Sequence, residues 1–121
     1  MDGLTWIEVA ALGGLGAIAR FLLDGLIGSA TGRELPFGTF AVNISGSFAL
    51  GLIDGLALHG NALLLAGTAT IGSYTTFSTW MLESHRLGED GEAAAAILNV
   101  VVSIAVGLGA LALGHLIGRQ L

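Results

Sequence analysis

The sequence predicts an all-α membrane protein with four transmembrane helices. Of the 121 residues, 54% are hydrophobic and only 11% are charged, whereas soluble domains have about 25% charged residues. The mean hydropathy is +0.85. A helix that crosses a bilayer needs about 20 apolar residues, so the chain has room for four spans and little else. We therefore expect one transmembrane domain over residues 1–121.

Four apolar stretches follow one another along the chain, separated by short polar turns. The first has no basic region before it and is too long for a cleaved signal peptide, so we expect it to be retained. Pro36 precedes the second stretch, where a proline favours the start of a helix. The charged residues 85–92 are expected to form an aqueous loop. The predicted spans of this multi-pass protein of the cell membrane are residues 4–27, 37–58, 62–84 and 93–117.

The composition argues against several classes of function. There is no cysteine, which excludes disulfides, thiolate metal sites and thiol redox chemistry. The net charge of −5 and the absence of lysine argue against binding to nucleic acid. The three histidines lack the spacing of metal ligands, and no ATP-binding motif or catalytic triad is visible. We therefore expect that the protein is not an enzyme.

Basic residues are divided almost evenly between the two ends of the predicted spans. An even number of spans places both termini on one side, with Arg119, while Arg33 and Arg86 lie on the other side. Orientation in the membrane depends on such counts, and a bias of about two against one is weak. Two alternatives stay open: insertion in both orientations, which gives an antiparallel homodimer, and one fixed orientation.

Two pairs of glycines have the small-xxx-small spacing that allows close helix packing. They are Gly51 with Gly55 in the second span and Gly114 with Gly118 in the fourth. Each pair fits a tight contact between subunits, and it fits ordinary packing inside one subunit equally well.

Polar side chains within the spans have two interpretations, an ion path or hydrogen bonds between helices. Asn43 lies deep in the second span, and Thr39 is on the same face by i,i+4 spacing. Asn99 and Ser103 form a similar pair in the fourth span. The sequence leaves both interpretations open for these residues.

Arg20 is a fixed cation within the first span. It can attract anions to the mouth of a pore, or its long side chain can reach the membrane surface. Asp24, one helical turn away, can pair with it, which would weaken either role.

Residues 72–80, with the sequence GSYTTFSTW, carry six hydroxyl groups between very apolar neighbours. Ser and Thr hydroxyls bond to backbone carbonyls, and β-branched side chains lose freedom in a helix. With Gly67 and Gly72 before the run, this pattern predicts a break in the third helix. Irregular backbone at membrane depth is tolerated only where protein buries it or where it lines a water-filled cavity, so we expect the break to lie at a functional site.

A break there would offer groups for ions of both signs. Free backbone carbonyls bind hard cations in other broken helices. Beyond the break, Ser78 and Thr79 supply hydroxyl donors, and Phe77 and Trp80 share a face on which they can present electropositive ring edges. Such neutral groups stabilise a small anion without the full counter-charge that would trap it. The segment therefore predicts an anion path.

Three motifs together resemble the small four-helix fluoride channels of bacteria and archaea, the Fluc or CrcB-type family. The third motif is the most specific, and the resemblance covers nearly the whole chain. It implies an antiparallel, dual-topology homodimer with two separate pores that export fluoride passively. The motifs are GGLGAIAR at 13–20, GTFAVNISGSF at 38–48, and GSYTTFSTW at 72–80 followed by Glu83.

The resemblance also implies roles for individual residues. Phe77 corresponds to the first phenylalanine of the family's aromatic box, while Trp80 replaces the second, so that an indole N–H could bind the ion instead of a ring edge. The backbone carbonyls of Gly72 and Thr75 from both subunits resemble the ligands of a structural sodium ion. The fluoride-pore residues implied in this way, or placed beside them, are Asn43, Thr39, Phe77, Ser78, Thr79, Trp80, Arg20 and Ser103.

Two alternatives to a fluoride channel remain at the level of sequence. A proton-coupled exporter like the small multidrug transporters also has four spans, but it needs a titratable carboxylate within the membrane. Glu8 is the only candidate in the first span. The chain could also be a structural subunit of a larger complex. The expected partners are otherwise fluoride, the lipid bilayer and a second copy of the chain.

Overall fold

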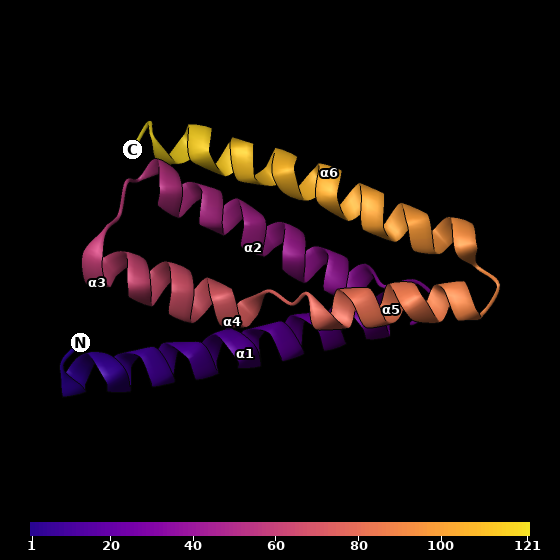
Figure 1. Cartoon of the computed structure of the whole chain (residues 1–121), viewed down its shortest axis with the longest axis horizontal. Helices are drawn as coiled ribbons and strands as arrows, with labels where there is room; N and C mark the ends of the chain where they lie inside the picture. Colours follow the sequence, from indigo (N-terminus) through magenta and orange to yellow (C-terminus); the bar gives the residue numbers. More distant parts are fainter.

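The computed structural model describes residues 1–121, which form helices and no strands. The predicted all-α fold is confirmed. Figure 1 shows α2 between α6 and the run from α3 to α5, with α1 along the other side of that run. Both termini lie at the same end as the turn before α3. The elements are α1 (Gly3–Thr31), α2 (Phe37–Gly55), α3 (Gly60–Leu63), the π-helix η1 (Leu64–Ile71), α4 (Gly72–Tyr74), α5 (Ser78–Glu89) and α6 (Ala93–Gly118).

Three of these helices, α1, α2 and α6, are long and apolar enough to cross a membrane by length and composition. The chain is a multi-pass membrane protein. The predicted third span, 62–84, is divided among α3, η1, α4 and α5, and none of these helices has the length of a span by itself. The count of four spans therefore stays a prediction.

The expected aqueous loop over 85–92 is wrong for most of its length, because α5 continues to Glu89. An i,i+4 contact between His85 and Glu89 lies on this part of the helix, and such pairs stabilise exposed helices. Only three residues separate α5 from α6. Among them Gly91 has φ +79°, a conformation that favours glycine and allows the sharp reversal into α6.

The middle of the third segment departs from α-helical geometry, and threonine hydroxyls add hydrogen bonds to its carbonyls. Within η1, the Thr70 hydroxyl donates to the Leu65 carbonyl at 2.7 Å. Further on, the Thr75 hydroxyl and the Thr75 backbone N–H both donate to the Ile71 carbonyl, at 3.1 and 3.0 Å. Thr75 is then extended, with φ −80° and ψ 159°, so the helix stops at Tyr74 and starts again at Ser78.

The closest helix packing is between α2 and α6, where glycines of each helix meet backbone of the other. A methyl group at Gly51 would fall on the Leu111 carbonyl, and one at Gly55 would fall on the His115 carbonyl. In the opposite direction, a methyl group at Gly114 would fall on the Phe48 carbonyl. Gly118 is equally close to α2. Both glycine pairs therefore pack inside one chain, which decides between the two alternatives that the sequence left open.

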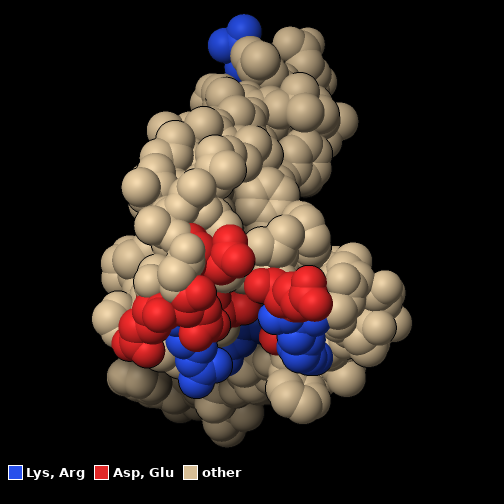
Figure 2. All heavy atoms as spheres, turned by 90° about the vertical axis from the view of Figure 1, so that its right-hand side faces the viewer, with Lys and Arg blue, Asp and Glu red and all other residues tan.

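Charged side chains gather at one end of the helices. Figure 2 looks onto this end and shows acidic and basic atoms crowded together in its lower part, with one separate basic group at the top and uncharged surface between them. A cavity of about 240 Å³ lies among them. Its charged lining residues are Asp24, Arg33, Glu34, Glu83, Arg86 and Asp90.

Candidate functional site

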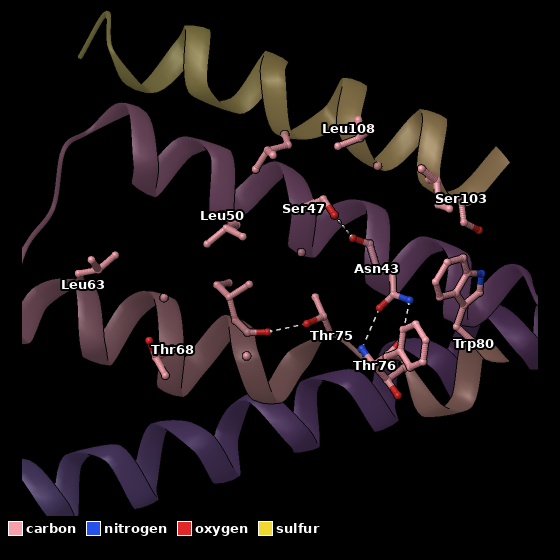
Figure 3. A pocket seen from close by; sticks show the side chains of 18 residues that line it. Asn43, Ser47, Leu50, Leu63, Thr68, Thr75, Thr76, Trp80, Ser103 and Leu108 are labelled. Carbon is pink, nitrogen blue, oxygen red and sulfur yellow. Dashed lines mark hydrogen bonds between the residues drawn. The ribbon is translucent and has the colours of Figure 1, made fainter. Parts of the chain in front are cut away.

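The break in the third segment is held by one side chain of α2. The Asn43 amide Nδ2 donates to the Thr76 carbonyl at 2.8 Å, and the Thr76 backbone N–H donates to Asn43 Oδ1 at 2.9 Å (Figure 3). We call these two bonds the Asn43–Thr76 pair. In an unbroken helix, the N–H and the carbonyl of Thr76 would bond to other backbone groups of the same helix, and here Asn43 takes the place of both. An amide nitrogen carries two donors, so the pair leaves one N–H of Asn43 for another acceptor.

Thr76 also bonds to the first turn of α5, the helix that follows the break. Its hydroxyl accepts a hydrogen bond from the Thr79 backbone N–H at 3.3 Å, in the manner of a helix cap. Thr76 is 9% exposed, so its peptide and hydroxyl are largely withdrawn from the surroundings. Sequence reasoning did not include Thr76 among the site residues, because nothing in the sequence marks which of the clustered hydroxyl residues loses its helical bonds.

A cavity of about 620 Å³ lies between α2, the third segment and α6, and we call it the first cavity. Figure 3 shows Asn43, Trp80 and Ser103 toward one end of it, with Leu50 and Leu63 toward the other. The Ser103 hydroxyl is buried and has no hydrogen-bond partner. Of the residues predicted from the sequence, the first cavity brings together Asn43, Gly72, Thr75, Phe77, Trp80 and Ser103.

Phe77 and Trp80 form an aromatic pair on the wall of the first cavity. Their ring centroids are 5.6 Å apart and the planes meet at 79°, an edge-to-face contact. Phe77 is 70% exposed in the single chain. The Trp80 indole N–H donates to the Asn99 carbonyl at 3.3 Å. The indole N–H thus has an acceptor on α6 in the single chain, and its binding to an ion stays a prediction.

A second cavity of about 200 Å³ adjoins the first, since Thr76 lines both. It brings together three further predicted residues, Arg20, Thr39 and Thr79. Asp24 also lines this cavity. The expected pairing of Arg20 with Asp24 is not present, as the ion pairs of the chain involve only histidines.

Glu83 is the residue that best extends the site toward the charged end. The Thr39 hydroxyl donates to its carboxylate, and Glu83 lines the charged cavity, which shares Asp24 with the second cavity. The signal for this position was present in the sequence, because Glu83 follows Thr79 by four residues and so lies on the same helix face. The three cavities thus form a series in which neighbours share a lining residue, Thr76 between the first and second and Asp24 between the second and the charged cavity.

Two candidates lie outside this series. Ser78 is exposed and lines none of the three cavities. Glu8, the carboxylate that a proton-coupled exporter would need in the first span, lines none of them either. The chain also has no group of three or more His, Cys, Asp or Glu residues that could hold a metal ion.

Apolar spanning helices, with neighbouring cavities that polar side chains help to line, are typical of the class of integral membrane proteins that includes small ion channels and transporters. Within that class, the chain belongs to the CrcB family. The family model described as "CrcB-like protein, Camphor Resistance (CrcB)" matches residues 7–115. The resemblance found in the sequence motifs is thereby confirmed.

Relatives similar over nearly their whole length carry a more specific name. "Fluoride-specific ion channel FluC 2" of Mycolicibacterium paratuberculosis is 52% identical over 117 residues, which cover 97% of this chain and 93% of the relative. The protein of the same name from Mycobacterium tuberculosis is 50% identical over 114 residues, covering 94% and 90%. "Fluoride-specific ion channel FluC 1" of Symbiobacterium thermophilum is 40% identical over 121 residues, covering 95% and 98%.

Proposed function

We propose that this chain forms a fluoride-selective channel that lets fluoride leave the cytoplasm passively, down its electrochemical gradient. Fluoride is suggested by the names of the relatives. The observation in the structure that carries the proposal is the position of Asn43, whose amide closes the break and keeps one N–H free at the first cavity. Hydrogen fluoride crosses membranes as a neutral acid and dissociates inside, so an anion pore is sufficient to remove the trapped ion.

The donors around the first cavity suit a small anion that must also leave. They are the second N–H of Asn43, the unpartnered hydroxyl of Ser103 and the positive edges of the Phe77 and Trp80 rings. None of the residues that line the first cavity is charged. A site without a full counter-charge binds weakly enough for conduction. Arg20, in the second cavity, raises the local concentration of anions next to this path.

The proposal includes a second copy of the chain, antiparallel to the first, and hence two pores. In a single copy, the Phe77 ring on the wall of the first cavity is 70% exposed. An ion path along this ring has to be closed off from lipid by other protein, which a second copy would supply. The weak arginine bias between the two ends supports insertion in both orientations. With one first cavity in each copy, a dimer has two paths.

A structural sodium ion at the centre of the dimer fits the carbonyls that the resemblance suggested. No hydrogen bond reaches the carbonyl oxygens of Gly72 or Thr75, because the Thr76 N–H that could return to Gly72 donates to Asn43 instead. Two such oxygens from each copy would supply four neutral ligands. Neutral oxygen ligands suit a hard monovalent cation, and no carboxylate lines the first cavity. Bound there, the ion would hold the two breaks together.

Removal of sodium should therefore weaken the dimer. Purified protein in which N-methylglucamine replaces sodium throughout should dissociate more readily in detergent and should carry less fluoride current than protein kept in sodium. An unchanged dimer and current after complete exchange would contradict the sodium site, while leaving the fluoride channel intact.

The function itself is tested with the purified chain alone in liposomes loaded with fluoride or with chloride. We expect rapid electrogenic efflux of fluoride and little efflux of chloride. Absence of fluoride efflux from well-folded protein would reject the proposal. Efflux from the purified chain would exclude the alternative of a subunit that works only within a larger complex.

Glu8→Gln separates the channel from a proton-coupled exporter. Because Glu8 lines none of the three cavities, the variant should keep fluoride efflux within about twofold of the wild type, as is usual for substitutions away from special features. The measurement is the same liposome assay, with and without a pH gradient. Loss of all transport in this variant would favour the exporter.

A further inference from the structure

Two hydrogen bonds connect α5 and α6 beside the aromatic pair, and a third lies within α5. The Trp80 indole N–H donates to the Asn99 carbonyl at 3.3 Å. The Asn99 side-chain amide donates to the Ser84 hydroxyl at 2.8 Å, and this hydroxyl donates to the Trp80 carbonyl at 2.9 Å. The bonds lead from Trp80 to α6 and back to Trp80, and we call them the Trp80 hydrogen-bond loop.

We propose that Ser84 and Asn99 are positioning residues that fix the indole of Trp80 and, through it, the ring of Phe77 at the wall of the first cavity. Neither Ser84 nor Asn99 lines that cavity, so neither touches the proposed ion path directly. Their effect passes through Trp80, which does line it. The inference rests on the proposed function for its conduction readout.

Within one chain, Phe77 depends on Trp80, which is its aromatic neighbour. The ring is 70% exposed in the single chain, and Trp80 is its aromatic neighbour in edge-to-face contact. The orientation of the indole therefore sets the direction of the Phe77 ring. An aromatic ring attracts an anion with its edge and not with its face. Rotation of the indole would therefore weaken the attraction of both rings for an anion in the first cavity.

The loop is well placed to limit that freedom. Ser84 is 7% exposed, and a buried hydroxyl or amide that loses its partner is costly. The bond from Asn99 to Ser84 fixes α6 against α5, which keeps the Asn99 carbonyl within reach of the indole N–H. Trp80 is thus held at both ends, through its backbone carbonyl by Ser84 and through its ring by Asn99.

Ser84→Ala tests the loop, because it removes the acceptor of the Asn99 amide and changes little volume. The experiment uses the full chain with Trp6→Phe, since Trp6 is the other tryptophan and is 62% exposed. We expect the fluorescence anisotropy of Trp80 in liposomes to fall. We also expect the fluoride current to fall about 5-fold, the effect of one net hydrogen bond of about 1 kcal/mol. Ser84→Thr, which keeps the hydroxyl, should restore both.

Coupling to Trp80 distinguishes positioning from a general loss of stability. In a Trp80→Phe chain there is no indole to place, so adding Ser84→Ala should leave the current nearly unchanged. An equal loss of current with and without the indole would overturn the inference, and so would a fall in current without a change in anisotropy, or the reverse.

Two further measurements complete the design. Ser29→Ala is the control, because its hydroxyl is exposed and bonds only to the Leu26 carbonyl, and it should change neither readout. If Ser84→Ala does not fold, Asn99→Leu removes the same bond from the other side and should show the same pair of effects. If the parent chain folds but carries no fluoride, the proposed function fails, and the anisotropy still tests the loop.

Discussion

Asn43→Asp should reduce the fluoride current at least about 100-fold while the protein is still inserted in the membrane. The substitution places a negative charge beside the first cavity, where Asn43 now offers a neutral donor. Two like unit charges roughly 5 Å apart repel by about 3 kcal/mol at an effective dielectric constant of about 20, and about 1.4 kcal/mol corresponds to a factor of ten. The measurement is single-channel or macroscopic current in planar bilayers.

The same substitution also disturbs the break. An ionised carboxylate cannot donate to the Thr76 carbonyl, so the bond of 2.8 Å is replaced by a contact between two acceptors. Protonation of the introduced carboxyl restores a donor, and we therefore expect part of the current to return at low pH. Current is the suitable readout, because neutral hydrogen fluoride that leaks through lipid carries none.

Asn61→Asp is the matched control for Asn43→Asp. It makes the same chemical change at an exposed position near the start of α3, and it should leave the current unchanged. Full current in Asn43→Asp at neutral pH would show that Asn43 does not lie on the ion path.

Gly114→Val should prevent stable folding of the chain. A side chain at Gly114 would fall on the Phe48 carbonyl of α2 and would also meet the Leu52 backbone N–H. Backbone atoms cannot move aside as a flexible side chain does, so the helices would have to separate, at a cost of at least about 3 kcal/mol. The expected result is loss of a monodisperse protein in detergent, with a strongly lowered unfolding temperature where any is recovered.

Gly109→Val provides the control on the same helix. No atom lies within 4 Å of a methyl group added at Gly109, so this variant includes the helix-propensity cost of valine without the collision. It should remain folded, with an unfolding temperature near that of the wild type. Equal losses in both variants would mean that valine in α6, and not contact with α2, is responsible.

Much of the fold follows from apolar length alone. The stretches predicted at 4–27, 37–58 and 93–117 correspond to α1, α2 and α6, with differences of a few residues at their ends. Hydropathy measures what a segment can bury, and it marks these helices clearly. It could not predict that α5 continues to Glu89, because this part of the helix is mostly polar and has a single buried apolar residue, Leu87.

The irregular third segment was harder to predict in detail. The cluster of hydroxyl residues indicated that the helix is disturbed, but the π-helix η1 and the extended residue Thr75 depend on which carbonyl each hydroxyl reaches. The glycine pairs showed the same difficulty. Their spacing predicted close packing, while only the contact of Gly114 with Phe48 shows that the neighbouring helix belongs to the same chain.

The candidate site was predicted as a set of residues but not as a set of contacts. Asn43, Phe77, Trp80 and Ser103 do line one cavity. The bond between Asn43 and Thr76 joins residues 33 positions apart, and sequence spacing has no information on such a pairing. The hydrogen bond from the Trp80 indole N–H to the Asn99 carbonyl could likewise not be predicted, because this acceptor is a backbone atom that no sequence pattern identifies.

The Asn43–Thr76 pair has a consequence for the order of assembly. Because a side chain of the same polypeptide supplies the partners of both the Thr76 N–H and the Thr76 carbonyl, these two groups need neither water nor a neighbouring molecule when the segment enters lipid. Each newly made chain can thus leave the insertion machinery with its break already shaped. In the proposed dimer, the second copy would then cover the exposed ring of Phe77 and the free carbonyls of Gly72 and Thr75, and it would not have to create the break.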